Sequence, residues 1–243
     1  MTVSDELSRV ERDLGHPLLR PRDAATLVLI DRSGRQPRVL LGRRNPRQAF
    51  MPGVFVFPGG RVDPEDRRVP VFGALDGESE RRLAARVVRP SPTRSRALAL
   101  AAIRETYEET GLLLGTREAG PPPALPGGWA GFGAAGLYPS LESLAFVARA
   151  ITPPGRSRRF DTRFFMADAR GIAHRVDGMA GPDRELVELA WLTLPQAMEA
   201  EVHRITRAIL GEVAARLDAG AHPRLPVPFF FMRAGRFHRE LLD

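Results

Sequence analysis

Short apolar runs alternate with turn-forming residues along most of the chain, and this pattern predicts β-strands. The first two runs, 24–31 and 39–44, flank the turn-forming segment SGRQ, so we expect them to pair as a hairpin. The remaining predicted strands are 54–57, 112–114, 144–153, 159–169 and 185–194.

Three other segments favour helices. In 94–110 the apolar residues recur at broadly helical spacing, and Gly111 stands where a C-terminal glycine belongs. Segment 75–88 is less regular, whereas 195–220 has a proline near its start and a glycine at its end. Strands with flanking helices and a leading hairpin predict an α/β domain with a mixed sheet.

Three glutamates crowd into the end of the helix predicted at 94–110. The offsets between Glu105, Glu108 and Glu109 bring their carboxylates to one helix face. Like charges so placed repel each other, and a divalent cation would offset that repulsion. An E-x-x-E-E pattern by itself is usually a solvated helix face, so this interpretation depends on neighbouring motifs.

Composition and charge narrow the class of protein. The 243 residues are 43% hydrophobic, which suits a packed globular core, and the absence of cysteine excludes disulfides and thiolate zinc sites. All 36 basic residues are arginine, spread along the chain with a modest cluster at Arg156, Arg158 and Arg159. Nucleic-acid binders concentrate charge in a patch, so we expect no nucleic-acid partner; the net charge of +7 equally suits an anionic phosphate substrate.

Other site classes and cell locations find little support in the sequence. No apolar run approaches the ~20 residues of a membrane span, and residues 1–17 are charged and lack the apolar core of a signal peptide, so a cytoplasmic protein is expected. No nucleophile elbow or P-loop occurs. Residues 227–232, VPFFFM, are either packed core, the favoured interpretation, or an exposed partner surface.

The segments around the glutamates resemble the Nudix hydrolase family. Its box, G-x5-E-x7-R-E-U-x-E-E-x-G-U with U a bulky apolar residue, is matched in its second half by 104–112, RETYEETGL, with Thr106 a mild departure. Gly60 of the upstream PGG matches the opening glycine. The acid six residues later is Asp66, with Glu65 beside it, where the family has glutamate.

The box is also longer than usual, because the 37 residues 67–103 replace the expected seven. An insertion at this point resembles the peroxisomal coenzyme A diphosphatase branch of the family. The resemblance covers about 22–217 and implies an α/β/α sandwich with a mixed β-sheet between helices. We therefore expect 1–243 to form a single Nudix hydrolase domain, with an insertion at about 67–93 and an irregular Pro/Gly-rich loop at 120–136.

The resemblance implies roles for the box residues in metal-dependent hydrolysis of a nucleoside diphosphate linked to another moiety. Glu105 and Glu109 would bind Mg²⁺ or Mn²⁺ directly, Glu108 directly or through water, and the Gly59 carbonyl is a further ligand candidate. Arg104 would orient the glutamates. Asp66 or Glu65 would brace the loop against the helix.

Two further roles are less specific. Some family members use a box glutamate as the general base, and others use an acid from a later loop. By their position in the sequence, Glu185 and Glu188 are candidates for this role. Arg158, Arg159 and Arg163 are candidates for contacting substrate phosphates, since a guanidinium suits phosphate.

The preferred substrate is coenzyme A or acyl-CoA. ADP-ribose and NADH hydrolysis, and a non-catalytic nucleotide-binding Nudix module, remain as alternatives, and a homodimer is possible. The insertion's arginines would suit either the 3′-phosphate of CoA or solvent: Arg67, Arg68, Arg81, Arg82, Arg86 and Arg89.

Overall fold

The computed structural model describes residues 19–48 and 51–243, so the expectation about the charged N-terminal segment lies outside the described residues. A nine-stranded sheet forms the centre, with the order β10-β2-β1-β8-β7-β11-β12, β3 pairing with β2 and β4 with β1. Its strands are β1 (Arg22–Asp31), β2 (Arg38–Arg44), β3 (Phe55–Val56), β4 (Gly59–Arg61), β7 (Ala145–Ile151), β8 (Phe160–Asp168), β10 (Leu186–Thr193), β11 (Val227–Arg233) and β12 (Arg236–Leu242).

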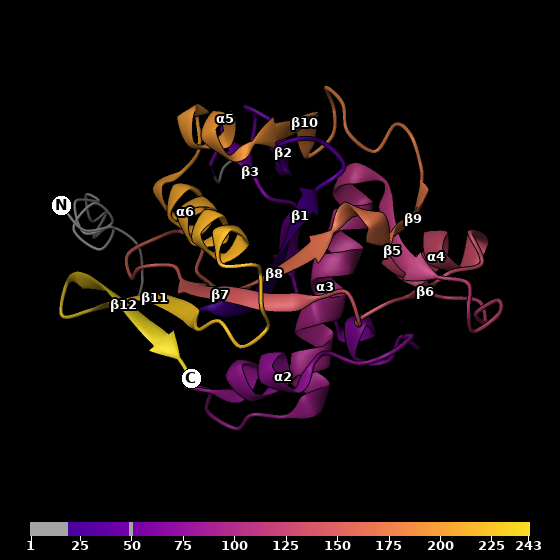
Figure 1. Cartoon of the computed structure of the whole chain (residues 1–243), viewed down its shortest axis with the longest axis horizontal. Coiled ribbons are helices and arrows are strands. Elements are labelled where there is room, and N and C mark those ends of the chain that lie inside the picture. The colour runs from indigo at the N-terminus through magenta and orange to yellow at the C-terminus, as the bar shows by residue number, and fades with distance from the viewer. Residues whose placement is uncertain (1–18, 49–50) are drawn as a thin grey trace.

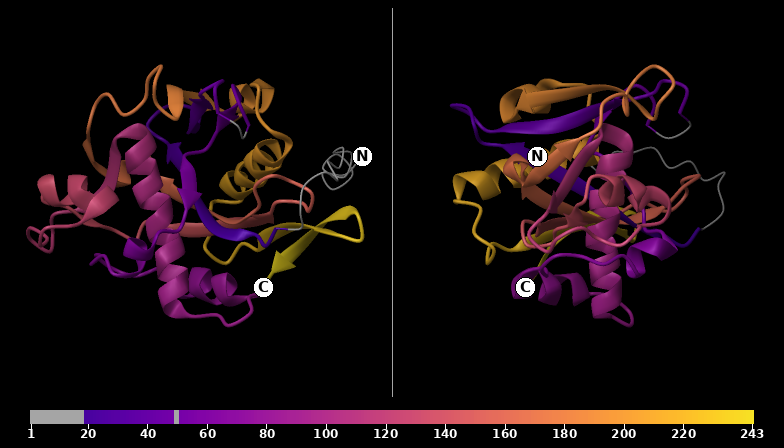
Figure 2. Two further views of the ribbon diagram at one scale, coloured as in Figure 1. Left: turned by 180° about the vertical axis from the view of Figure 1, so that it is seen from behind. Right: turned by 90° about the vertical axis from the view of Figure 1, so that its right-hand side faces the viewer.

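Helices cover both faces of this sheet (Figures 1 and 2). A small second sheet, in the order β6-β5-β9, lies beside the C-terminal end of the longest helix. The helices are α2 (Gly77–Ala84), α3 (Pro92–Thr110), α4 (Ala130–Ala134), α5 (Leu194–Glu199) and α6 (Arg204–Asp218), with 3-10 turns at Pro64–Arg67, Gly127–Trp129 and Ala169–Gly171; the small sheet contains β5 (Leu112–Thr116), β6 (Tyr138–Pro139) and β9 (Ile172–Arg175).

Alternation along β1 builds two cores. Ala25, Leu27 and Leu29 pack in the cluster that contains the apolar residues of α3, whereas Val28 and Ile30 pack in the cluster that contains those of α6. Successive side chains of a strand point to opposite faces, so a strand with apolar residues at both parities is covered on both sides. The predicted α/β class and layered arrangement are confirmed.

The sheet is mixed, as predicted. β1 pairs with β8 and β7 with β11 in parallel, whereas β7–β8 and β11–β12 are antiparallel. The leading hairpin is present, but β1 and β2 share only the register pairs Ile30↔Val39 and Asp31↔Arg38. Nearer its start, β1 pairs with β4 instead, which brings the Gly59–Gly60 backbone beside α3.

The prediction of one continuous helix at 195–220 is wrong, because α5 ends at Glu199 and α6 begins at Arg204. Ala200 has extended backbone angles, φ −64° and ψ 162°, and the carbonyl of Glu201 accepts a hydrogen bond from Phe55 N at 2.8 Å. The chain therefore leaves the helix to pair with β3. His203 then caps α6, its side chain accepting from Ile205 N.

The insertion is an ordered part of the fold. Its helix α2 lies beside the C-terminus in Figure 1, and the buried Arg82 donates hydrogen bonds to the carbonyls of Pro223, Arg224 and Leu225. Arg86 forms an ion pair with Glu240 at 2.5 Å. Arg82 therefore fastens the insertion to the loop before β11, and Arg86 fastens it to β12.

One further segment is more ordered than the sequence suggested, and another agrees with the expectation. The loop at 120–136, expected to be irregular, contains a 3-10 turn and α4, with Trp129 and Phe132 fully buried. Phe229 and Phe230 of β11 are buried, which supports the packed-core interpretation of VPFFFM. Within the described residues, no helix has the length and apolar character needed to cross a membrane.

Candidate functional site

The site lies on the last two turns of α3. Ser91 caps this helix by accepting from Arg94 N, Pro92 occupies its first turn, and Gly111 ends it in the left-handed conformation with φ 77°. A Cβ at Gly111 would also lie 1.9 Å from the Val176 carbonyl oxygen, so glycine is required there. This end of the helix carries the three predicted glutamates.

Arg104 joins two of those glutamates. Its Nη1 donates to Glu105 Oε1 at 3.0 Å and to Glu108 Oε2 at 2.8 Å, while its Nη2 donates to the Arg61 carbonyl at 2.8 Å. The guanidinium is 2% exposed, so its charge acts on both carboxylates with little screening. This geometry agrees with the orienting role that the resemblance implied.

Asp66 fixes the other side of the guanidinium. The fully buried carboxylate accepts from Arg104 Nε at 2.9 Å and Nη2 at 3.1 Å, from Asp63 N at 2.8 Å and from Trp129 Nε1 at 3.1 Å. Of the two acids considered from the sequence, Asp66 is therefore the one that braces the loop, and its shorter side chain performs the task. Trp129 escaped the sequence analysis because its segment had no helical or strand periodicity.

Glycine backbones approach the carboxylates closely. Gly59 N donates to Glu109 Oε2 at 3.0 Å. A Cβ added to Gly60 would lie 2.4 Å from the carboxyl carbon of Glu105, and one added to Gly128 would lie 2.0 Å from Glu108 Oε1. Both the PGG loop and the 120–136 loop are thus packed against the box glutamates, and a side chain at either glycine would displace the carboxylate beside it.

Burial raises the pKa values of all three glutamates, and neighbouring carboxylates raise them further. Burial raises the pKa of Glu105 to about 7, against the lowering effect of Arg104, with Glu108 raising it further. Burial also raises the pKa of Glu109 well above its ordinary value, assisted by the charges of Glu185 and Glu105. The pKa of Glu108 is raised by burial despite Arg104. This repulsion is the electrostatic feature that a cation would relieve.

The structure separates the two candidates for the general base. The charge of Glu185 raises the pKa of both Glu109 and Glu105, and its carboxylate pairs with Arg44 Nη2 at 2.9 Å. Glu188 instead pairs with Arg43 Nε at 3.2 Å, and that guanidinium lies over the Phe55 ring. Glu185 is therefore electrostatically coupled to the site.

The three arginines considered for phosphate contact lie in different settings. Arg163 is 1% exposed, and its Nη1 pairs with Asp161 Oδ1 at 3.0 Å and Asp23 Oδ1 at 3.2 Å. Arg159 donates to the carbonyl of Thr152 at 3.0 Å and Arg158 is exposed. The contacts of Arg163 and Arg159 are structural, and substrate contact by any of the three stays a prediction.

The donor set suits a hard cation, although the side chains are held by the protein's own groups. Carboxylate and carbonyl oxygens are the ligands that Mg²⁺ and Mn²⁺ prefer. Among the described residues, no three acidic or imidazole groups converge closely enough to hold an ion as they stand. Glu105 and Glu108 share Arg104 Nη1, and Glu109 accepts from Gly59 N, so these contacts compete with metal ligation.

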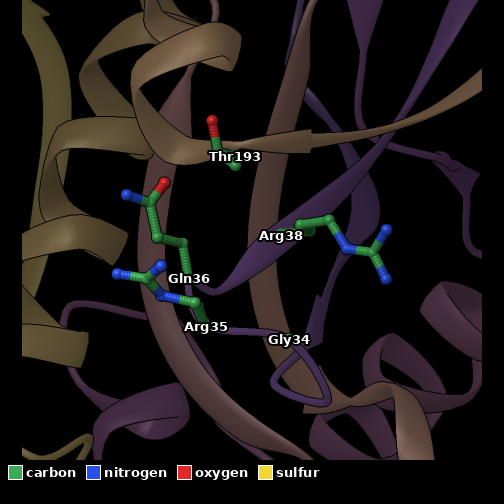
Figure 3. Close-up of a pocket in the computed structure, with 5 residues that line it drawn as sticks. All are labelled: Gly34, Arg35, Gln36, Arg38 and Thr193. Carbon is green, nitrogen blue, oxygen red and sulfur yellow. The ribbon is translucent and has the colours of Figure 1, made fainter.

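The concavity drawn in Figure 3 lies elsewhere. It has a volume of about 730 Å³ and is lined by Gly34, Arg35, Gln36, Arg38 and Thr193, without a carboxylate. It borders the turn after Asp31, six residues and about 20 Å along β1 from Ala25, the register partner of Gly60. Its place and lining do not match the chemistry of the glutamate cluster.

Known proteins resemble this chain at the level of sequence and structure. No family model matches. The acyl-coenzyme A diphosphatase NUDT19 of Gallus gallus is 29% identical over 212 residues, covering 66% of this chain and 55% of the relative, so the chain spans about half the length of that protein. The crystal structure of a NUDIX hydrolase from Alicyclobacillus acidocaldarius is 32% identical, with a TM-score of 0.59, and the match covers 82% of this chain and 93% of that one. The chain therefore belongs to the Nudix hydrolases, a family of pyrophosphohydrolases.

Proposed function

We propose that the chain hydrolyses a nucleoside diphosphate linked to another moiety, using a divalent metal bound by Glu105, Glu108 and Glu109. The observation that carries this proposal is the placement of the three carboxylates: Glu105 and Glu108 accept from Arg104, while Glu109 accepts from Gly59 N and Glu105 lies against Gly60. A solvated helix face would leave the glutamates free in water. Here they are partly buried, mutually repelling and held by specific donors.

Mg²⁺ or Mn²⁺ fits this donor set, with the Gly59 carbonyl as a further ligand candidate. When bound, such an ion would neutralise phosphate oxygens and lower the pKa of a water molecule for attack on phosphorus. Binding needs ionised carboxylates, so the raised pKa values of Glu105 and Glu109 mean that protons compete for the same oxygens.

The chain's own residues have separate tasks. Arg104 holds Glu105 and Glu108 at a fixed spacing, and Asp66 holds Arg104 through two hydrogen bonds. Glu185 is our candidate for accepting a proton from the attacking water, and the effect of its charge on Glu105 and Glu109 supports this choice over Glu188. Arg44, its ion-pair partner, would hold the Glu185 carboxylate in position.

We propose coenzyme A or an acyl-CoA as the substrate, cleaved at the diphosphate. The acyl-CoA diphosphatase activity for which the 29% identical NUDT19 is named supports this choice, as does the insertion within the box. ADP-ribose and NADH are the alternatives within the same chemistry. A non-catalytic module is disfavoured because all three box glutamates are present and placed together.

The test is product analysis with purified protein and Mg²⁺ or Mn²⁺. CoA, acetyl-CoA, ADP-ribose and NADH are incubated with wild-type and Glu109→Gln protein, and phosphorus-containing products are separated. We expect CoA or acetyl-CoA to be cleaved fastest, with loss of activity in the variant. Faster cleavage of ADP-ribose or NADH would reject the CoA substrate, and undiminished activity in the variant would reject the metal site.

A further inference from the structure

A second, strongly basic cavity borders the glutamate site. Its volume is about 380 Å³, and it lies between the start of β1 and the segment that follows β4. The lining residues are Arg22, Asp23, Arg61, Val62, Asp63 and Arg67.

Three guanidinium groups of this cavity contact no carboxylate among the residues that the structure describes. The side chains of Arg22, Arg61 and Arg67 are exposed, and the structure gives none of them a hydrogen-bond or ion-pair partner among the described residues. In the same chain, many other arginines hold a carboxylate or a carbonyl. Three arginines without partners in one cavity are therefore a feature that needs a ligand or solvent to complete it.

The two carboxylates in the cavity do not cancel that charge. Asp23 is already occupied, because Arg94 Nε and Nη2 donate to it at 2.7 Å each and Arg163 Nη1 lies 3.2 Å away. Asp63 is closest to a different guanidinium, with its Oδ2 lying 3.8 Å from Arg104 Nη2. The three free arginines thus give the cavity a net positive charge that suits an anion.

The cavity and the glutamate site share a wall. The carbonyl of Arg61 accepts from Arg104 Nη2, and Asp63 lies against the same nitrogen, while Nη1 of that guanidinium contacts Glu105 and Glu108. The width of one guanidinium therefore separates the basic cavity from the carboxylates. A ribose that carries both a diphosphate and a second phosphate could therefore place the diphosphate at the carboxylates and the second phosphate in the basic cavity.

We propose that Arg22, Arg61 and Arg67 form a subsite for a phosphomonoester carried on the nucleotide's ribose, beyond the diphosphate that is cleaved. The inference rests on the proposed hydrolase function and adds a specificity element to it. It assigns to this pocket only Arg67 of the insertion's arginines, since Arg82 and Arg86 have structural partners.

The first test measures binding without turnover. Adenosine 3′,5′-bisphosphate and AMP are titrated by calorimetry into wild-type, Arg61→Gln/Arg67→Gln and Arg68→Gln protein. Arg68 is the matched control, being an exposed neighbour that does not line the cavity. We expect the bisphosphate to bind the wild type at least about fivefold more tightly than AMP, as charge-assisted phosphate contacts allow. The double variant should lose this advantage and Arg68→Gln should keep it.

The second test compares hydrolysis of CoA and 3′-dephospho-CoA. We expect the double variant to raise KM for CoA about fivefold or more, with kcat and the kinetics of dephospho-CoA little changed. Equal binding of the two nucleotides by the wild type, or an advantage that survives in the double variant, would overturn the subsite. If the wild type cleaves neither coenzyme, the proposed substrate is wrong, and the nucleotide titration still decides whether the subsite exists.

Discussion

Trp129 Nε1 donates a hydrogen bond to Asp66 Oδ1 across 3.1 Å, between two side chains that are both fully buried. The bond joins the loop at 120–136 to the box, because Asp66 also holds Arg104, and Arg104 holds Glu105 and Glu108. A segment that resembles a linker in sequence thus supports the charged groups on α3.

Trp129→Phe should weaken the site through this chain of contacts. Phenylalanine keeps an aromatic ring beside Phe132, whose centroid lies 5.2 Å from that of Trp129, but it removes the only N–H of the side chain. Loss of a buried hydrogen bond to a carboxylate should cost about 2 kcal/mol of unfolding free energy. Mn²⁺ affinity, measured by electron paramagnetic resonance, should fall about tenfold.

A control distinguishes positioning from general destabilisation. Phe146→Leu removes buried aromatic area from the same core, away from Asp66, and should lower stability without changing Mn²⁺ affinity. Equal losses of Mn²⁺ affinity in Phe146→Leu and Trp129→Phe would mean that Trp129 acts only through stability.

Gly128→Ala should displace Glu108. The added methyl carbon would lie 2.0 Å from Glu108 Oε1 and 2.8 Å from Arg104 Cδ, so one or both side chains must move. If Glu108 binds the metal as proposed, its displacement by about 1 Å should lower kcat/KM tenfold or more. Gly77→Ala is the control, since nothing lies within 4 Å of its Cβ position. Unchanged kcat/KM in Gly128→Ala would show that catalysis does not depend on the position of the Glu108 carboxylate.

Sequence patterning predicted the elements whose periodicity is set by burial. The buried runs of β1, β2 and β8 and the helix α3 with its terminal Gly111 follow from apolar spacing and capping chemistry. The break between α5 and α6 was not predictable in the same way, because helical propensity continues through 200–203. It arises from long-range pairing of Glu201 with Phe55.

In the candidate site too, residues with a local sequence signal were predicted and residues that act through long-range contacts were not. The box residues were identified by their spacing and by resemblance, since they lie within one helix and one glycine loop. Trp129 and Gly128 act through contacts across more than 60 and 20 residues respectively, with Asp66 and Arg104. Such contacts have no local signal in a single sequence. The burial of Arg163 has no local signal either, because the pattern of its strand does not show which face of the sheet a charged side chain occupies.

The two candidate bases should separate on substitution. Glu185→Gln removes a carboxylate whose charge acts on Glu105 and Glu109, and kcat should fall by about 10²–10⁴ if it accepts the proton from water. Glu188→Gln disrupts only an exposed pair with Arg43 and should leave kcat within about twofold. Rates at saturating substrate and metal provide the measurement, and a larger effect from Glu188→Gln would reverse the assignment.

Metal binding should release protons. Without metal the pKa of Glu105 is about 7 and that of Glu109 is raised well above its ordinary value, chiefly by burial. At pH 6 Glu105 is therefore largely protonated, and its ligation should displace about one proton per ion, to which the raised pKa of Glu109 adds a further contribution. Mn²⁺ affinity should accordingly weaken as pH falls below 7.

Calorimetric titration of Mn²⁺ in buffers of different ionisation enthalpy counts these protons. Glu109→Gln, which has no proton to release at that position, should show a smaller count. Proton release of zero in the wild type at pH 6 would contradict ligation by these two carboxylates.

Asp23 should make stability depend on pH in the acid range. Burial by itself would raise its pKa, but the hydrogen bond from Arg94 and the charge of Arg163 lower it below the ordinary value of 3.8. The unfolded chain therefore binds a proton at a higher pH than the folded one, so this stabilisation is present above about pH 4 and is lost as pH falls through the lower folded pKa.

Asp23→Asn removes a negative charge beside the buried Arg163, and it should lower the free energy of unfolding by about 2 kcal/mol at pH 7. Urea unfolding of wild type and Asp23→Asn between pH 2.5 and 7 should show this difference shrinking below pH 4, whereas Asp177→Asn, at a side chain 89% exposed, should show little difference at any pH. A difference for Asp23→Asn that stays constant to pH 2.5 would mean that the ion pair with Arg94 and Arg163 contributes nothing that protonation can remove.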